Sequence, residues 1–355
     1  MEIGQALPVE KVKQSRLPQV DFNNIPFGKI YSDHMLVAEF KNGQWDGGKI
    51  IPFGDLPLSP ATSTIHYGQS IFEGLKAYKS ETEDKVLLFR PDENFKRFNE
   101  SATRLCMPHV PEEVFMDGLF QLVNLDREWV PNTPGCSLYI RPFMFAADAY
   151  LGLKPSDSYK FLIITSPVGD YYAEPVRVKI ERHYTRAAKG GTGYAKCAGN
   201  YAASIYPAKL AQEKGYHQLL WTDGAKHEFI EEAGSMNVMF VIGDKLITAP
   251  AGDSILHGIT RKTVLTLAKE WGMEVEERPV EVKEVLEAVK NGTLKEAFGT
   301  GTAATIAHII AIGDDGTDYE LPAIETREFS NKVLKELTGI QRGNKEDAHN
   351  WIFKI

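Results

Sequence analysis

KGGTGYAKCAGNY, residues 189–201, is the stretch around which the rest of the chain is organised. Its lysine, Lys196, stands among glycines, small residues and two tyrosines, with no acidic residue inside the stretch. The glycines permit backbone conformations that bring the chain close to a ligand. Two interpretations stay open at this point. Lys196 is either held in a site where its amine acts as a nucleophile, or it is incidental to a flexible loop.

Two common phosphate-binding motifs do not fit this stretch. A P-loop has glycine before its lysine and serine or threonine after it, whereas Lys196 is flanked by Ala195 and Cys197. The dinucleotide pattern G-x-G-x-x-G begins at Gly191 and Gly193, but Lys196 replaces its third glycine. Neither nucleotide motif is therefore predicted.

Composition excludes several classes of protein. The 355 residues can form two domains, and the net charge of −8 without a basic run argues against a nucleic-acid partner. No apolar stretch approaches the roughly 20 residues of a membrane span, and the first residues lack the apolar core of a signal peptide. The three cysteines are odd in number and do not form a zinc pattern. We expect a cytoplasmic protein with no metal and no membrane association.

Strand and helix patterns occur in both halves, which predicts an α+β or α/β protein. The first 28 residues read as an extended arm that packs on the body or on a partner. Apolar runs and alternation predict strands at residues 34–41, 86–89, 137–145, 160–168, 176–181, 217–221, 237–242 and 245–249. Periodicity and end signals predict helices at residues 91–105, 112–129, 201–214, 260–271, 281–290 and 325–337.

A domain boundary is predicted near PVGDYYAEP, residues 167–175, where two prolines and a glycine separate apolar strands. We expect a smaller N-terminal domain at 1–168, a linker at 169–177 and a larger domain at 178–355.

Three further stretches of the second half could act with Lys196. Glu232 precedes a small-residue turn in FIEEAGSMN, and SILHGITRK places Gly-Ile-Thr at a helix start, where unpaired N–H groups suit a phosphate. GTGTAAT offers loop glycines with the hydroxyls of Thr300 and Thr302. Each alone is typical of ordinary structure. Together, a lysine, an acid and two anion-binding loops favour pyridoxal 5′-phosphate, bound covalently through Lys196.

From about Phe27 to the C-terminus the chain resembles the branched-chain amino acid aminotransferases. The blocks that carry this resemblance are FGKIYSDHML, HYGQSIFEGLKAY, LFRPDENFKRFNESATRLCMP, SLYIRP, SPVGDYY, KGGTGYAKCAGNY, EEAGSMN, LHGITR and FGTGTAA. The resemblance implies fold type IV of the pyridoxal-phosphate enzymes, shared with D-amino acid aminotransferase. Proteins of this fold type have a smaller N-terminal α/β domain and a larger C-terminal pseudo-barrel domain.

The resemblance also implies roles for individual residues. Lys196 would be catalytic and hold the cofactor, Tyr201 would bind the oxygen of its ring, and Glu232 would pair with its pyridine nitrogen. The remaining cofactor-binding residues would be Arg97, Leu256, Ile259, Thr260 and Thr302. An aromatic wall and its neighbours would bind substrate: Phe27, Tyr67, Phe72, Tyr139, Arg141, Tyr171, Ser235 and Ala303. Leu151 and Leu153 would reach into the pocket of a second subunit, which implies a homodimer.

The resemblance predicts a transaminase that interconverts L-leucine, L-isoleucine and L-valine with their 2-oxo acids, using 2-oxoglutarate and L-glutamate, by a ping-pong mechanism. Arg141 would receive the distal carboxylate of glutamate. The chain departs from its relatives at Ala304 and Ala307, where animal forms carry a cysteine pair, so no thiol switch is expected there. The alternatives are a D-amino acid aminotransferase or lyase of the same fold, a non-covalent nucleotide-phosphate binding protein, and a non-catalytic relative.

Overall fold

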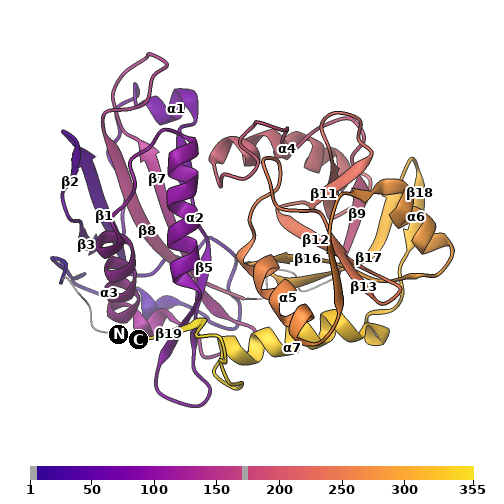
Figure 1. Ribbon diagram of the computed structural model, residues 1–355. Helices are drawn as coiled ribbons and strands as arrows, with labels where there is room; N and C mark the ends of the chain where they lie inside the picture. Colours follow the sequence, from indigo (N-terminus) through magenta and orange to yellow (C-terminus); the bar gives the residue numbers. More distant parts are fainter. Residues whose placement is uncertain (1–5, 170–174) are drawn as a thin grey trace. The chain divides into compact units, whose positions relative to one another are not determined.

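The computed structural model describes residues 6–169 and 175–355, which form two compact units (Figure 1). The first unit comprises Met1–Tyr171, Ala195–Gly199 and Thr338–Ile355, and the second comprises Tyr172–Tyr194 and Asn200–Leu337. Most of the predicted linker lies outside the described residues. Its last two residues, Val176 and Arg177, already belong to a strand.

The two later segments of the first unit differ from the predicted division, which gave them to the second domain. The C-terminal segment ends in β19, which pairs with β6, and Cys197 forms a β-bridge with Ile71. Pairing between distant parts of the chain therefore draws both segments into the first unit.

The sheet of the first unit runs in the order β19-β6-β5-β7-β8-β1-β2, with β3 paired to β1 and β4 paired to β7. Its strands are β1 (His34–Lys41), β2 (Gln44–Trp45), β3 (Lys49–Pro52), β4 (Ser70–Phe72), β5 (Leu75–Lys79), β6 (Val86–Phe89), β7 (Ser137–Ala146), β8 (Tyr159–Val168) and β19 (Ile352–Lys354). All of their pairings are antiparallel. The predicted strands in this region are confirmed to within one residue at each end.

Helices α1 (Ser63–Tyr67), α2 (Pro91–Arg104) and α3 (Gly118–Leu125) accompany this sheet (Figure 1). Proline in the first turn and two acidic residues beside it start α2, as its sequence predicts. The helix predicted at 112–129 is divided into a π turn (Glu113–Asp117), α3 and a 3₁₀ turn (Arg127–Trp129). Its apolar stripe nevertheless enters the core with Phe98 of α2 and Phe161 of β8.

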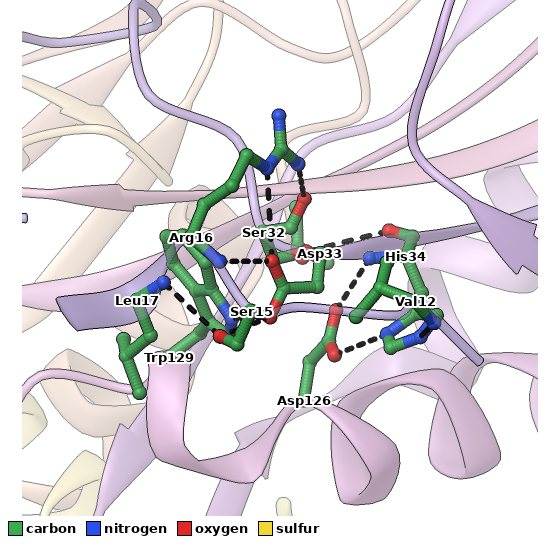
Figure 2. A network of polar contacts seen from close by, with 10 residues as sticks. Val12, Ser15, Arg16, Leu17, Ser32, Asp33, His34, Asp126 and Trp129 are labelled. Atoms are coloured by element: carbon green, nitrogen blue, oxygen red, sulfur yellow. Dashed lines mark hydrogen bonds and ion pairs between the residues drawn. The ribbon is translucent and has the colours of Figure 1, made fainter. Parts of the chain in front are cut away.

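The N-terminal arm packs on the first unit through a buried polar network (Figure 2). Asp33 accepts hydrogen bonds from Ser15 Oγ (2.5 Å), the Arg16 N–H (2.9 Å) and Trp129 Nε1 (3.0 Å). Next to it, the Val12 N–H donates to Nε2 of His34 (3.1 Å), so the ring proton lies on Nδ1, 2.6 Å from Asp126. The described part of the arm is therefore attached to its own chain, which is the first of the two arrangements predicted for it.

The second unit contains a sheet that closes on itself. The strands β12, β16, β17, β9, β10 and β11 are each paired to the next, and β11 also pairs with β12, so these six form a closed barrel. The strands of this unit are β9 (Val176–Ile180), β10 (Gln218–Thr222), β11 (Phe229–Ala233), β12 (Met236–Ile242), β13 (Lys245–Thr248), β14 (Glu274–Glu277), β15 (Val280–Glu281), β16 (Leu294–Gly301), β17 (Thr305–Asp314) and β18 (Thr317–Glu320).

The α-helices in the rest of the described chain are α4 (Ala198–Gln212), α5 (Ile259–Glu270), α6 (Val282–Lys290) and α7 (Glu328–Gln341). The apolar face of α6 packs into the barrel core beside Leu220 and Phe240. The predicted hairpin between β12 and β13 is confirmed, with Gly243 at a φ of 59° in its turn. Among the described residues, no helix has the length and apolarity to cross a bilayer. Two units of mixed helices and sheets, one of them a barrel, agree with the predicted fold class.

Candidate active site

The backbone of Lys196 is fixed on both sides within the first unit. Its N–H donates to Ser101 Oγ of α2 (2.9 Å), and its carbonyl accepts from the Phe72 N–H of β4 (3.0 Å). Ser101 Oγ in turn donates to the carbonyl of Arg97 (3.0 Å). A lysine anchored between a helix and a strand favours a positioned functional group over an incidental residue of a loop.

The side chain of Lys196 shares an aromatic ring with a second cation. Its Nζ lies 5.0 Å from the centroid of the Phe72 ring, and Cζ of Arg141 lies 4.5 Å from the same centroid. Arg141 also donates from Nη2 to the Tyr139 hydroxyl (3.0 Å), while its Nε is buried without a hydrogen-bond partner among the described residues. The aromatic ring stabilises both cations, and the buried Nε gives Arg141 a donor suited to a bound carboxylate.

A buried ion pair lies next to Phe72. The carboxylate of Glu73 accepts from Arg97 Nε (2.7 Å) and Nη2 (2.8 Å), and from Asn94 Nδ2 (2.7 Å). Complete burial opposes ionisation of Glu73. The Arg97 charge, these hydrogen bonds and the charge of Lys196 nevertheless hold the pKa of Glu73 below its ordinary value. Glu73 is therefore an anion at neutral pH, and it fixes the guanidinium of Arg97.

The other predicted residues of the first unit are near its surface. Phe27 contacts the Tyr139 ring edge-on, with the centroids 5.6 Å apart. Tyr67 ends α1 and is exposed. Leu151 and Leu153 lie in the connection between β7 and β8 and are 65% and 86% exposed. Tyr171, predicted to line the substrate pocket, lies outside the described residues.

In the second unit, β11 carries two adjacent carboxylates with different surroundings. Glu232 is buried; its Oε1 accepts from the Leu256 N–H (2.8 Å), and its Oε2 lies 3.2 Å from Nε of Arg186. The neighbouring Glu231 accepts from Ser254 Oγ (2.5 Å). Burial, together with the charges of Glu232 and Asp223, raises the pKa of Glu231 despite the opposing effects of Ser254 and Arg186. Arg186 acts on both acids, and it forms an ion pair with Glu232.

The start of α5 lies beside Glu232 and has the features of an anion site. Gly258 precedes the helix, no acidic residue occupies the first turn, and Ile259 and Thr260 supply its first N–H groups. A side chain at Gly258 would collide with Asn237, which donates to the Leu256 carbonyl (2.9 Å). This close packing holds the Leu256 loop against β12.

The remaining predicted residues of the second unit lie in turns and at a helix start. Tyr201 is in the first turns of α4, Ser235 is in the turn between β11 and β12, and Thr302 and Ala303 are in the turn after β16. Thr300, in the same Gly-Thr stretch, has a buried hydroxyl with no hydrogen-bond partner within the described part of the chain.

Reasoning from the sequence missed the residues that hold the predicted ones in place. Glu73, Ser101, Arg186 and Asn237 each contact a predicted site residue, yet no motif in the sequence marks them as its partners. One signal in the sequence could have indicated Glu73: it is the charged residue of IFEGL, which otherwise consists of apolar residues and glycine. A charge in such a stretch needs a buried partner of opposite charge.

Comparison with known proteins places these features in a family. The profile of the amino-transferase class IV family matches residues 70–312. The chain is 45% identical to branched-chain-amino-acid aminotransferase 2 of Bacillus subtilis, covering 99% of this chain and 97% of that protein. It is 40% identical to the branched-chain-amino-acid aminotransferase of Mycolicibacterium smegmatis, over 94% of this chain and 92% of the relative.

A solved structure shows the same fold. The branched-chain amino acid aminotransferase of Escherichia coli aligns with a TM-score of 0.73 and 26% identity, covering 90% of this chain and 98% of the other. Sequence and structure therefore agree that the chain belongs to the class IV aminotransferases, in the family of the branched-chain amino acid aminotransferases.

Proposed function

We propose that this protein is a pyridoxal-phosphate-dependent transaminase that interconverts L-leucine, L-isoleucine and L-valine with their 2-oxo acids, with 2-oxoglutarate and L-glutamate as the second pair. The observation that carries the proposal is the shared ring of Phe72, which lies beside both the Lys196 amine and the Arg141 guanidinium. A nucleophile and an anion receptor on one apolar ring suit a substrate with an amino group, an aliphatic chain and, in glutamate, a second carboxylate.

The residues of the second unit fit the cofactor. Glu232 is buried next to a cation, as a partner of a protonated ring nitrogen needs to be. Thr300 Oγ1 is a buried polar atom without a partner in the described chain, close in sequence to the proposed phosphate ligand Thr302. The N–H groups of Ile259 and Thr260, the hydroxyl of Thr302 and the guanidinium of Arg97 would hold the phosphate. Tyr201 would bind the ring oxygen, and Leu256 would pack on the ring face.

Proton transfer is assigned to Lys196. When bound, pyridoxal phosphate supplies a conjugated ring that accepts the electron pair left by loss of the α-proton. Lys196 would hold the cofactor covalently through its Nζ. Once released from the cofactor, the Nζ of Lys196 would take the proton from the α-carbon of the substrate. The hydrogen bonds from its main-chain N–H to Ser101 and from the Phe72 N–H to its carbonyl fix the backbone from which this amine extends.

Substrate binding is assigned to the aromatic wall and to Arg141. Phe27, Tyr67, Phe72, Tyr139 and Tyr171 would enclose the aliphatic side chain. Arg141 would bind the distal carboxylate of 2-oxoglutarate, whereas Ser235 and the backbone at Ala303 would bind the α-carboxylate. One pocket would thus accept both substrates in turn, which requires ping-pong kinetics.

A homodimer and a cytoplasmic location are part of the proposal. The exposure of Leu151 and Leu153 supports a homodimer, because a second copy of the chain could bury these two large apolar side chains of one loop. Sedimentation of the wild-type protein and of Leu153→Asp tests this directly. A wild-type monomer would contradict it.

Steady-state kinetics with L-leucine and 2-oxoglutarate test the function. We expect parallel double-reciprocal lines, and a loss of roughly 10²–10⁴-fold or more in turnover for Lys196→Ala. Lys189→Ala, at an exposed lysine of the same stretch, is the matched control and should keep wild-type activity. A Lys196→Ala protein with wild-type turnover would refute the assignment. Activity with D-alanine but not L-leucine would favour the D-amino acid alternative.

A further inference from the structure

Arg186 joins three segments of the second unit. From Nη2 it donates to the carbonyls of Gly193 (3.2 Å) and Ser254, and its Nε lies 3.2 Å from Oε2 of Glu232. Its side chain is 9% exposed and that of Glu232 is 3% exposed. The guanidinium is thus anchored by two backbone carbonyls, and it forms an ion pair with one oxygen of a buried acid, while its Nε makes no hydrogen bond among the described residues.

The two oxygens of Glu232 are held by different groups. Oε1 accepts from the Leu256 N–H (2.8 Å) and lies 3.4 Å from Nδ2 of Asn237, both of them neutral donors. Oε2 faces Arg186. The nearby acid Glu231 hydrogen-bonds to Ser254, and the charge of Arg186 acts on it as well. Arg186 is therefore a cation placed against a buried carboxylate, and its charge offsets the cost of burying an ionised acid.

The protonation of this carboxylate matters for a ring nitrogen placed against it. An ionised carboxylate accepts a hydrogen bond from a protonated pyridine nitrogen. A neutral carboxylic acid would instead donate its proton to an uncharged ring. A cation beside the carboxylate lowers its proton affinity and so leaves the proton on the ring.

We propose that Arg186 is a positioning residue for the reaction, whose charge keeps Glu232 ionised and thereby keeps the pyridine nitrogen of the cofactor protonated. This inference rests on the proposed function, because it assumes that Glu232 pairs with that nitrogen. It adds a residue outside the predicted site that sets how strongly the ring withdraws electrons.

The test is the ¹⁵N resonance of pyridoxal phosphate labelled at its ring nitrogen, bound to the full-length protein without substrate. We expect a protonated ring nitrogen in the wild type and in Arg186→Lys, which keeps the charge. In Arg186→Gln the resonance should move to the position of an unprotonated pyridine nitrogen. A merely structural role of Arg186 would not produce this dependence on charge.

Two outcomes would overturn the proposal in distinguishable ways. If Arg186→Gln keeps the wild-type resonance, Arg186 does not control the proton, and the proposed function stands. If the wild type already has an unprotonated ring nitrogen, the role of Glu232 in the proposed function fails as well. Should Arg186→Gln not fold, lysine and acetyl-lysine at position 186 form a matched pair that differs mainly in charge, and equal resonances in that pair would also refute the inference.

Discussion

Replacing Glu73 by glutamine tests how the first unit holds Arg97 beside Lys196. Glu73 is completely buried and accepts two hydrogen bonds from Arg97 and one from Asn94. Glu73→Gln keeps the shape but removes the charge, which leaves the Arg97 guanidinium buried without its counter-ion. Removing one partner of a buried ion pair costs about 3–5 kcal/mol. We expect a loss of that size in the free energy of unfolding of the first unit at neutral pH.

The pH dependence of this loss has a definite sign. Because the folded-state pKa of Glu73 lies below its ordinary value of 4.5, its charge contributes stability that is complete above that value. The contribution is lost as the pH falls through the lowered pKa. The difference between wild type and Glu73→Gln should therefore be constant near neutrality and should shrink below about pH 4.5.

Hydrogen–deuterium exchange of peptides from α2 and β5, measured in increasing urea, reports the opening of the first unit separately from the second. The control is the double variant Glu73→Gln/Arg97→Met, which removes both charges and should be less destabilised than Glu73→Gln alone. A loss below about 1 kcal/mol for Glu73→Gln, or a double variant that is clearly less stable than the single one, would refute the reasoning.

Three further predictions concern other parts of the chain. Arg141→Gln should raise the KM for 2-oxoglutarate by roughly 10- to 150-fold, which corresponds to the loss of one charge-assisted hydrogen bond. The KM for L-leucine should rise less, and equal increases for both substrates would contradict the role assigned to Arg141. Gly258→Ala places a Cβ 1.9 Å from Oδ1 of Asn237 and should weaken pyridoxal phosphate binding about fivefold or more. Gly252→Ala, with open space around its Cβ, should not change that affinity in the same titration. Burial opposes ionisation of Asp33, but hydrogen bonds from Arg16, Ser15 and Trp129 lower its pKa below the ordinary value of 3.8. The hydrogen bonds between Asp33 and the arm should therefore be intact above pH 3.8 and should weaken as the pH falls through the lowered pKa. Asp33→Asn should accordingly expose residues 12–17 to proteolysis already at neutral pH, and unchanged protection would argue against the network.

Local patterns allowed much of the secondary structure to be predicted from sequence. The strand over His34–Lys41 contains a continuous apolar run and is followed by a turn, and α2 has a proline and two acids in its first turn, so both follow from neighbouring residues alone. The division of the helix predicted at 112–129 did not follow, because its apolar stripe continues through the π turn and hides the change of pitch.

Contacts between distant residues could not be predicted in the same way. The resemblance to a known family supplied the list of site residues, but it named neither the partner of Arg97 nor that of Glu232. Glu73 follows β4 whereas Arg97 is on α2, and Arg186 is in the loop after β9 whereas Glu232 is on β11, so both pairs form only when separate segments of the chain fold together. The assignment of residues 195–199 and of the C-terminal segment to the first unit has the same origin.

Lys196 is proposed to hold pyridoxal phosphate and to exchange it with branched-chain amino acids. The visible absorption of the purified protein, loaded with pyridoxal phosphate, tests this proposal most directly. Addition of L-leucine should bleach the band, and 2-oxoglutarate should restore it, because each substrate completes one half of the reaction. A loaded protein whose band does not respond to L-leucine, or a protein that forms no band with pyridoxal phosphate, would contradict the account.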